Sequence, residues 1–294
     1  MSDSRKKVCF IVNPKSGTGK QKCIDQAIEK YIDRNSIDHV VRYTEYAGHA
    51  AVLTRAAVAE GMDAVIAVGG DGSVNEVASA LYGTNVALGI IPMGSGNGLA
   101  HHLKLSFSPK EAIASVNSFK LTAIDTAFVN NVFFVSIAGL GFDAHVADLF
   151  AKGTKRGFLS YFKITITEYL KYKPLKYKIL IDGKKLKRRA MMIVFANSDQ
   201  FGYNSSVAPD ASIRDGLLDV CIYGKPTLWQ APWLTWLLFT RRITSIKEVE
   251  SYKAKEISIY RKKDLPVNID GEPMQISRDL KVKIVPLSLK VIVG

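Results

Sequence analysis

Residues 64–76 read Ala64-Val65-Ile66-Ala67-Val68-Gly69-Gly70-Asp71-Gly72-Ser73-Val74-Asn75-Glu76. The first five residues form a short apolar run, which predicts a buried strand. The next four positions hold three glycines, which leave the backbone bare so that a phosphate can approach its amides. A helix is expected to begin near Ser73, where free N–H groups and the positive end of the helix dipole favour an anion. The stretch therefore predicts a strand, a phosphate-binding loop and a helix.

Asp71 is the acidic residue of this loop. A carboxylate beside bound phosphates is repulsive unless a cation or a proton transfer involves it. We therefore interpret Asp71 as a candidate catalytic residue that faces magnesium. The alternative is a plain turn in which the carboxylate accepts a hydrogen bond from nearby backbone.

Two further loops follow apolar runs in the same manner. Residues 8–12 lead into Asn13-Pro14-Lys15-Ser16-Gly17, and residues 86–91 lead into Pro92-Met93-Gly94-Ser95-Gly96-Asn97. Apolar residues at helical spacing come after each loop. The first ~125 residues thus predict strands alternating with helices in a largely parallel sheet. Because ligands bind at the carboxyl edge of such sheets, the three loops are expected to meet there.

A P-loop NTPase is disfavoured. The pattern GxxxxGK[ST] would need Gly in place of Pro14 and Ser or Thr in place of Gln21.

The pattern changes after residue 124. Strands are predicted at residues 123–129 and 132–137, which flank the hairpin signal Asn130-Asn131, and at residues 177–181, which precede the hairpin signal Asp182-Gly183. Later strands are predicted at 217–223, 256–260, 267–269, 282–285 and 289–293. The second half should therefore be mainly antiparallel β with few helices. A chain of 294 residues that is 47% hydrophobic favours two domains. We expect an α/β nucleotide-binding domain at residues 1–124 and a β-sandwich domain at residues 125–282.

Most of the net charge of +13 lies in residues 152–189, which hold thirteen Lys or Arg and two acidic residues. Such a cluster attracts nucleic acid, anionic lipid or an acidic substrate, or it is an ordinary solvated surface. No helix-turn-helix or aromatic RNA-binding signature accompanies it, so nucleic acid is not an expected partner. This cluster is our preferred candidate for peripheral contact with anionic lipid.

Residues 228–242 contain Trp229, Trp233 and Trp236 and end in Arg241-Arg242. They predict either an interfacial helix or, the interpretation we favour, a helix packed on the β domain. The apolar run is shorter than the ~20 residues that span a bilayer.

The cysteines, Cys9, Cys23 and Cys221, form no CxxC pair, so neither a disulfide framework nor a zinc site is expected. Residues 1–7 are polar and carry no signal-peptide pattern. We expect a cytoplasmic location, with peripheral contact on the inner face of the membrane.

Taken together, the motifs resemble those of the diacylglycerol kinase and sphingosine kinase superfamily, whose fold is like that of NAD kinases. The three loops look like its nucleotide-site motifs. Gly139-Leu140-Gly141-Phe142-Asp143, Asp215-Gly216-Leu217-Leu218-Asp219 and Asp270-Gly271-Glu272 look like later motifs of the family. The matches follow the family's order over nearly the whole chain.

This resemblance implies a kinase that transfers the γ-phosphate of ATP, with Mg²⁺, to a hydroxyl of diacylglycerol or a related lipid in a cleft between the two domains. Glu272 occupies the position of the proposed general base. By resemblance, Mg²⁺ is held by the Asp215 carboxylate and the backbone carbonyls of Ser212 and Leu217. Residues 283–294 would return to the first domain, and a homodimer is one possible assembly.

The residues expected around the nucleotide lie in the three loops and after the second predicted strand. They are Asn13, Pro14, Lys15, Ser16, Gly17, Thr44, Gly70, Asp71, Gly72, Ser73, Val74, Asn75, Glu76 and Ser95.

Several positions depart from the family pattern. Gly98 and His101 stand where relatives often carry Asp and Arg, and His145 stands where they often carry an acidic group that faces the acceptor lipid. The acceptor is therefore open, and a sphingoid-base kinase is the alternative enzyme. A non-catalytic nucleotide or lipid sensor is the alternative of another class, and an NAD kinase is less expected. Taken alone, Asp270-Gly271 would predict only a hairpin turn with Glu272 exposed.

Overall fold

The computed structural model describes residues 5–17, 24–153, 158–202 and 205–294. Cys23, residues 18–20 of the first loop and residues 154–157 of the basic segment lie outside the described residues. The chain divides into two compact units, which are described separately. Unit 1 comprises Met1–Thr126 and Pro286–Gly294, and unit 2 comprises Ala127–Val285. The boundaries predicted from the sequence, 124/125 and 282/283, lie two and three residues earlier, respectively.

Unit 1 is built on a parallel sheet. Its strands β1 (Lys6–Val12), β2 (Ile37–Tyr43), β3 (Ala64–Gly69) and β4 (Ala87–Pro92) lie in the order β2-β1-β3-β4. All three strand pairs are parallel. The end of β18 (Asp279–Val293) adds a further parallel neighbour, with Val291 opposite Leu88. Strands β3 and β4 are buried along their whole length, as the apolar runs predicted.

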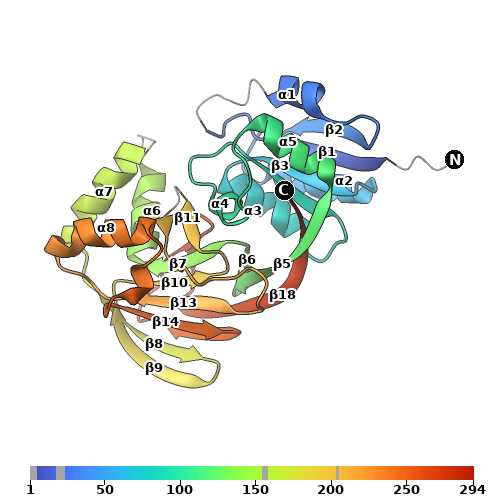
Figure 1. Cartoon of the computed structure of the whole chain (residues 1–294). Helices are drawn as coiled ribbons and strands as arrows, with labels where there is room; N and C mark the ends of the chain where they lie inside the picture. The colour runs from blue at the N-terminus through green and yellow to red at the C-terminus, as the bar shows by residue number, and fades with distance from the viewer. Residues whose placement is uncertain (1–4, 18–23, 154–157, 203–204) are drawn as a thin grey trace. The chain divides into compact units, whose positions relative to one another are not determined.

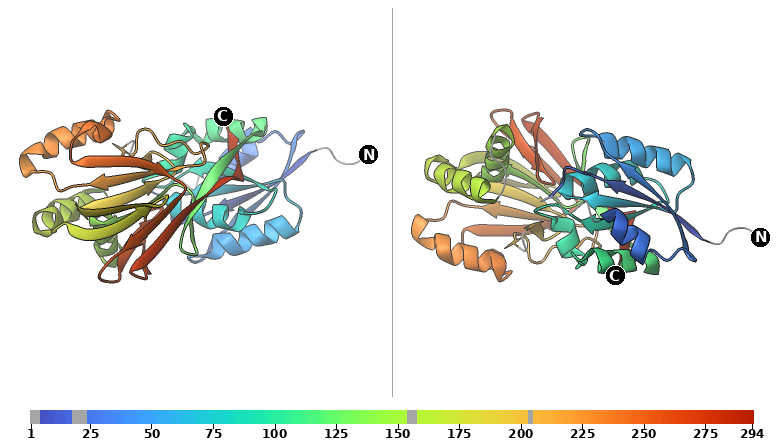
Figure 2. Two further views of the ribbon diagram at one scale, coloured as in Figure 1. Left: turned by 90° about the horizontal axis from the view of Figure 1, so that it is seen from below. Right: turned by 90° about the horizontal axis from the view of Figure 1, so that it is seen from above.

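Helices cover both faces of this sheet. They are α1 (Ile24–Tyr31), α2 (His49–Ala59), α3 (Asp71–Leu81), α4 (Gly98–His102) and α5 (Pro109–Ser118). Ile28 of α1 and Ile113 of α5 pack with Phe10 and Ile66 of the sheet in one apolar core. Helices α2 and α3 lie on the opposite face (Figures 1 and 2). Helix α3 begins at Asp71, two residues before the predicted start.

Within the described residues of unit 2, the strands form two large antiparallel sheets and a two-stranded one, β11-β12. The first has the order β14-β13-β10-β7-β16-β17, and the second contains β9, β8, β15 and the first part of β18. Strand β5 (Lys120–Val129) begins in unit 1 and ends in unit 2. The other strands are β6 (Val132–Phe134), β7 (Ile137–Gly141), β8 (Leu175–Ile181), β9 (Lys184–Ala190), β10 (Met192–Ala196), β11 (Gln200–Gly202), β12 (Ser205–Ser206), β13 (Leu218–Tyr223), β14 (Val249–Ala254), β15 (Glu256–Tyr260), β16 (Leu265–Ile269) and β17 (Glu272–Ile276). The expected combination of a parallel α/β part and an antiparallel β-sandwich is therefore confirmed.

The sandwich has a third layer made of helices. Phe195 and Val220 of the six-stranded sheet pack with Ile179 and Ile257 of the other sheet to form the largest core. Helices α6 (Phe142–Lys152), α7 (Phe158–Lys171) and α8 (Ala231–Phe239) lie on the other face of the six-stranded sheet (Figure 1). Sequence analysis did not identify α6 and α7. None of the helices within the described ranges is long and apolar enough to cross a membrane.

Three predicted strands differ from the structure in being split or merged. Residues 132–137 break into β6 and β7, because the backbone N–H groups of Val135, Ser136 and Ile137 donate to the Asp270 carboxylate. Residues 282–285 and 289–293 belong to one long strand, β18.

Candidate active site

The carboxyl ends of the four parallel strands of unit 1 bring the predicted loops together. The N–H of Thr44, after β2, donates to the Val12 carbonyl at 2.9 Å, and the N–H of Asn13, after β1, donates to the Val68 carbonyl at 3.0 Å. The N–H of Met93, after β4, donates to the Gly69 carbonyl at 2.8 Å. We call the loops at this edge, residues 13–17, 69–73 and 93–97 together with Thr44, the strand-end site.

Glycine is required where the second and third loops touch. A Cβ atom on Gly94 would lie 2.4 Å from the Gly70 Cα, and one on Gly70 would lie 3.1 Å from the Gly94 Cα. A Cβ on Gly69 would lie 2.6 Å from the Ser73 Oγ. The glycines therefore serve backbone packing between loops, in addition to the bare amides that the sequence indicated.

Asp71, the first residue of α3, connects the second loop to the third. Its Oδ2 accepts the backbone N–H of Asn97 at 2.8 Å and its Oδ1 accepts that of Gly98 at 2.7 Å. Asn97 has a left-handed backbone with φ of 56°. Its Oδ1 accepts the backbone N–H of Gly94 at 3.1 Å, and its Nδ2 donates to the Gly94 carbonyl at 2.7 Å. Asp71 thus positions the third loop, a role that sequence analysis did not foresee.

Like Asp71, Glu76 accepts two backbone N–H groups near the start of a helix, here α2. Its Oε1 accepts the N–H of Gly48 at 2.8 Å and its Oε2 accepts that of Ala50 at 3.0 Å. Gly48 is the N-cap of α2, where a negative charge also interacts favourably with the helix dipole. The Glu76 carboxylate therefore ties α3 to the N-terminus of α2.

Asn13 joins the first loop to the second. Its Nδ2 donates to the Ser73 Oγ at 3.1 Å, and its Oδ1 accepts the N–H of Lys15 at 2.9 Å. The Ser16 hydroxyl donates to the Asn13 carbonyl at 3.0 Å. The Lys15 side chain is exposed, as a cation that meets phosphate must be.

The other predicted nucleotide residues also lie in or next to these loops. Pro14, Gly17 and Ser95 are exposed, Thr44, Gly70, Gly72, Ser73 and Asn75 are half-buried, and Val74 is buried.

In unit 2, Glu272 stands at the start of β17 directly after a tight turn. Asp270 and Gly271 both have positive φ, 45° and 90°, which is the two-residue turn typical of hairpins. Asp270 is 6% exposed, and its carboxylate accepts the N–H groups of Val135, Ser136 and Ile137, each at 2.9 Å. The Glu272 side chain is exposed. Asp270 therefore anchors the turn that presents Glu272.

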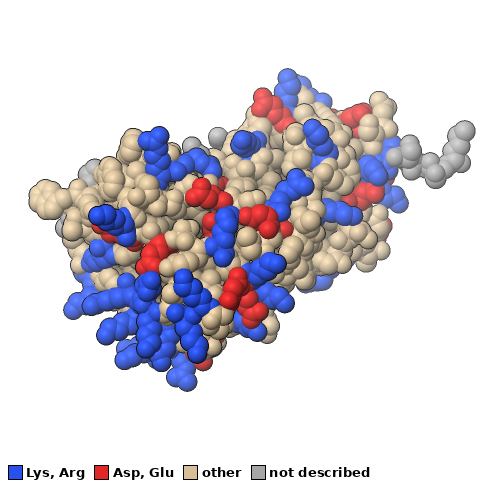
Figure 3. Space-filling view, turned by 60° about the horizontal axis from the view of Figure 1, so that its bottom comes forward, with Lys and Arg blue, Asp and Glu red and all other residues tan. Residues whose placement is uncertain are grey.

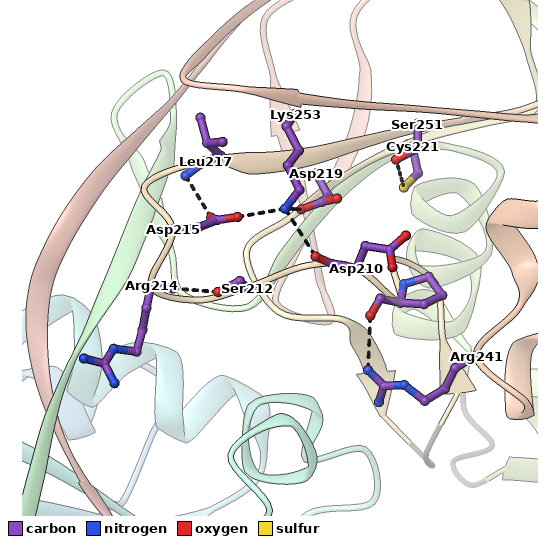
Figure 4. A network of polar contacts seen from close by, with 11 residues as sticks. Asp210, Ser212, Arg214, Asp215, Leu217, Asp219, Cys221, Arg241, Ser251 and Lys253 are labelled. Atoms are coloured by element: carbon purple, nitrogen blue, oxygen red, sulfur yellow. Dashed lines mark hydrogen bonds and ion pairs between the residues drawn. The ribbon is translucent and has the colours of Figure 1, made fainter.

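The predicted magnesium loop lies beside a lysine that sequence analysis did not identify (Figure 4). The Lys253 Nζ is 2.7 Å from the Asp215 Oδ2 and 3.1 Å from the Asp219 Oδ2, and it also donates to the Asp210 carbonyl at 3.2 Å. Desolvation lowers the pKa of Lys253, but the bonds to Asp215 and Asp219 outweigh it, so that the pKa lies above its ordinary value. Burial raises the pKa of Asp219, and the bond from Lys253 offsets part of this effect.

The sequence matches two family descriptions, one in each half. Residues 7–129 match the diacylglycerol kinase catalytic domain, and residues 136–293 match the YegS C-terminal NAD kinase beta sandwich-like domain. A diacylglycerol kinase of Mycobacterium tuberculosis is 30% identical over 262 residues, which cover 86% of this chain and 84% of the relative. The chain belongs to the diacylglycerol kinase family.

Other members of the family agree with this assignment. A diacylglycerol kinase of Bacillus subtilis is 27% identical over 276 residues, covering 91% of this chain and 90% of the relative. The solved structure of a diacylglycerol kinase from Bacillus anthracis has a TM-score of 0.75 at 20% identity, with 98% of this chain and 97% of that chain covered. This second likeness concerns the fold alone. The family resemblance read from the loop motifs is thus confirmed.

The expected magnesium ligands of the family can be compared with the donors of this chain. Asp215 accepts the Leu217 N–H through Oδ1 at 3.1 Å and binds Lys253 through Oδ2. The predicted ligands, the Asp215 carboxylate and the carbonyls of Ser212 and Leu217, are oxygen donors of the kind that Mg²⁺ prefers, and their role as ligands stays a prediction. Among the residues the structure describes, no three His, Cys, Asp or Glu side chains cluster as metal ligands.

The GxGxD motif of the family places a buried carboxyl group at the start of α6. Asp143 is 7% exposed, and a Cβ on Gly139 would lie 2.1 Å from its Oδ2, so only glycine admits this carboxyl. Burial raises the pKa of Asp143 to about 7. Its nearest side-chain partner is the Asn268 Nδ2 at 3.5 Å. His145, expected to face the acceptor, has its Nε2 2.9 Å from the Glu168 Oε2 on α7.

Proposed function

We propose that this protein is a lipid kinase that transfers the γ-phosphate of ATP to a hydroxyl of diacylglycerol or a closely related lipid. Membership of the diacylglycerol kinase family supports the reaction class. The observation that carries the proposal within this chain is the strand-end site, where three glycine-bearing loops meet at the carboxyl edge of a parallel sheet.

The nucleotide half of the reaction is assigned to unit 1. Open parallel sheets bind phosphates at this edge, where helix N-termini direct backbone N–H groups and the positive end of their dipole. The eleven-residue helix α3 begins in the second loop, and Lys15 adds an exposed cation in the first. We assign ATP phosphate binding to the amides of residues 70–73 and to Lys15, Ser16 and Ser95.

The chemical half is assigned to unit 2. Glu272 accepts the proton of the lipid hydroxyl as the acceptor oxygen forms a bond to the γ-phosphorus and the bond from that phosphorus to the β,γ-bridging oxygen breaks. ADP leaves with the bridging oxygen. An exposed carboxylate on a rigid turn suits a general base, because the turn is held by three hydrogen bonds to Asp270.

Asp215, Ser212 and Leu217 are assigned to Mg²⁺, which when bound supplies charge neutralisation at the phosphates. The Lys253 Nζ donates to the Asp215 Oδ2 at 2.7 Å and orients this carboxylate. Asp71 is assigned a second function beyond its support of the third loop, because a carboxylate in the phosphate-binding loop can meet the hydrated cation that accompanies the phosphates. Phosphoryl transfer requires positioning and charge stabilisation more than covalent work by the protein.

The test is a labelling experiment. The purified protein is incubated with Mg²⁺, γ-³²P-ATP and a total lipid extract, and the labelled product is identified after chromatography. A labelled phosphatidic acid is expected. A labelled sphingoid-base phosphate would mean that the acceptor is a sphingoid base instead of diacylglycerol. Binding of ATP without any labelled lipid would contradict the proposal and favour a sensor.

A further inference from the structure

Large apolar side chains gather on the solvent side of α7 and of the segment that contains α8. Trp229 is 94% exposed, and the other two tryptophans are about half exposed. The set, which we call the tryptophan surface, consists of Tyr161, Phe162, Ile166, Leu170, Trp229, Trp233, Trp236 and Phe239. The expectation that residues 228–242 form a helix packed on the β domain therefore holds for only one side of this helix.

Helix α8 has an inner and an outer apolar side. Leu234, Leu237 and Leu238 pack on the six-stranded sheet. Trp233 and Trp236 are three residues apart on the outer side of α8, which faces water, and Trp229 lies in the 3-10 turn Leu228–Gln230 that leads into the helix and is exposed as well. A helix that is apolar all round is normally covered on both sides, so the outer side calls for a partner.

Helix α7 repeats this arrangement. Phe162, Ile166 and Leu170 form an exposed stripe at intervals of four residues, while Tyr169 packs inward beside Phe142. The Lys225 Nζ donates to the Tyr172 carbonyl at 2.7 Å, which ties the end of α7 to the chain that leads into α8. Both helices lie at the same end of unit 2 (Figures 1 and 2).

Cations border the tryptophan surface. Lys163, Lys171, Lys173 and Arg242 are exposed on the two helices or within a few residues of their ends. Glu168, the acidic residue of α7, is already bound to His145 at 2.9 Å and to Lys171 at 3.7 Å. Aromatic side chains with flanking Lys and Arg are the composition of helices that lie in the headgroup region of an anionic bilayer.

We infer that the tryptophan surface docks this protein on an anionic phospholipid bilayer, with α7 and α8 lying in the interface. The inference rests on the proposed function, because the acceptor would be a lipid of that bilayer. The sequence alone favoured the whole of residues 152–189 as the lipid-contacting segment. The structure divides this basic segment between two opposite layers of unit 2, so the tryptophan surface takes its place as the proposed contact.

The other part of the basic segment faces away from the helices. On the outer face of the β8–β9 hairpin, Lys176 lies opposite Arg189 and Lys178 lies opposite Lys187. Figure 3 shows the crowding of Lys and Arg over these strands. The helices and this face are the two outer layers of the sandwich, so a flat membrane can touch only one of them. Attraction by lysines alone is screened by salt, whereas apolar insertion is not.

The experiment uses the protein's own fluorescence, because all three of its tryptophans belong to the tryptophan surface. Vesicles of phosphatidylglycerol and phosphatidylcholine are titrated into the full chain without nucleotide. We expect a blue shift of emission and quenching by brominated acyl chains, retained in part at high salt. The double variant Trp229→Ala/Trp236→Ala should bind at least tenfold more weakly with an unchanged circular dichroism spectrum.

A matched control removes two charges from the opposite face. Lys178→Gln/Lys187→Gln should keep the blue shift and stay within about threefold of the parent affinity. The proposal is overturned if this control abolishes binding while the tryptophan variant keeps it, if brominated lipids do not quench, or if the emission shift follows protein concentration in the absence of lipid, which would mean that a second copy covers the surface.

The same variants separate this inference from the proposed function. Activity toward a short-chain diacylglycerol in detergent micelles should be unchanged in the tryptophan variant. Vesicle binding by a parent protein that phosphorylates no lipid would contradict the proposed function and leave the docking surface intact.

Discussion

The variants Asp71→Asn and Glu76→Gln distinguish a supporting carboxylate from one that also takes part in phosphate transfer. Each parent carboxylate accepts two backbone N–H groups near the start of a helix, from Asn97 and Gly98 for Asp71 and from Gly48 and Ala50 for Glu76. An amide can accept only one of the two and turns its own N–H₂ toward the other. The two substitutions are therefore closely matched in their structural cost.

Each variant should lower the free energy of unfolding by about 1.5–3 kcal/mol, the usual worth of a hydrogen bond to a charged group. If Asp71 also meets the cation that accompanies the phosphates, Asp71→Asn should in addition lower kcat by roughly 100-fold or more, as the loss of one preorganised charge-stabilising group does. Glu76→Gln should keep kcat within a few-fold of the parent.

The assay compares kcat with saturating ATP and lipid at a temperature where urea titrations show both variants to be fully folded. Measuring stability and turnover on the same samples removes differences in folded fraction. Equal turnover of Asp71→Asn and Glu76→Gln would show that Asp71 takes no part in phosphate transfer and only supports the third loop.

Three other predictions concern single positions. Gly94→Ala should cost about 1–3 kcal/mol of stability and weaken ATP binding, because its Cβ would lie 2.4 Å from the Gly70 Cα, whereas Gly153→Ala, with contacts no closer than 3.4 Å, should change neither; normal ATP affinity in a folded Gly94→Ala would contradict this. The pKa of Asp143 is raised from 3.8 to about 7, so the folded state holds a proton that the unfolded state releases between these values. Its contribution to the free energy of unfolding should therefore fall as the pH rises through this window, by up to about 1.4 kcal/mol per pH unit, and Asp143→Asn should remove that slope in urea titrations from pH 5 to 8; an identical slope in both proteins would count against it. Lys187→Glu should stabilise unit 2 by roughly 0.2–1 kcal/mol, because it turns the cross-strand pair of Lys178 and Lys187 into a pair of opposite charge. The stability of Lys187→Gln should lie between those of the parent and Lys187→Glu. A loss of stability in Lys187→Glu would show that the two lysines do not repel each other.

The regular elements follow from the sequence where one physical rule determines them. The predicted strand at residues 256–260 coincides with β15, because its alternating apolar residues need a buried face. The meeting of the three loops follows from parallel pairing, since the carboxyl ends of parallel strands must share an edge. The turns at Asn130 and Asp182 follow from their tolerance of positive φ.

Contacts between residues far apart in the chain escape such rules. Asp71 bonds to backbone 26 and 27 residues away, and Asp270 to backbone more than 130 residues away. Lys253 reaches Asp215 from a neighbouring strand, 38 residues later. Apolar periodicity indicates that residues 228–242 form a helix, but it does not reveal that one apolar side stays uncovered.

In the proposed reaction, the chain phosphorylates a lipid and Glu272 is the base. The most direct measurement is the rate of transfer from γ-³²P-ATP to diacylglycerol by Glu272→Gln, made beside its ATP dissociation constant. Loss of the base should lower the rate by about 100- to 10,000-fold and leave ATP affinity unchanged, because Glu272 lies in unit 2 and its exposed side chain supports no core. Transfer of phosphate to the lipid at the parent rate by Glu272→Gln would show that Glu272 is not the base.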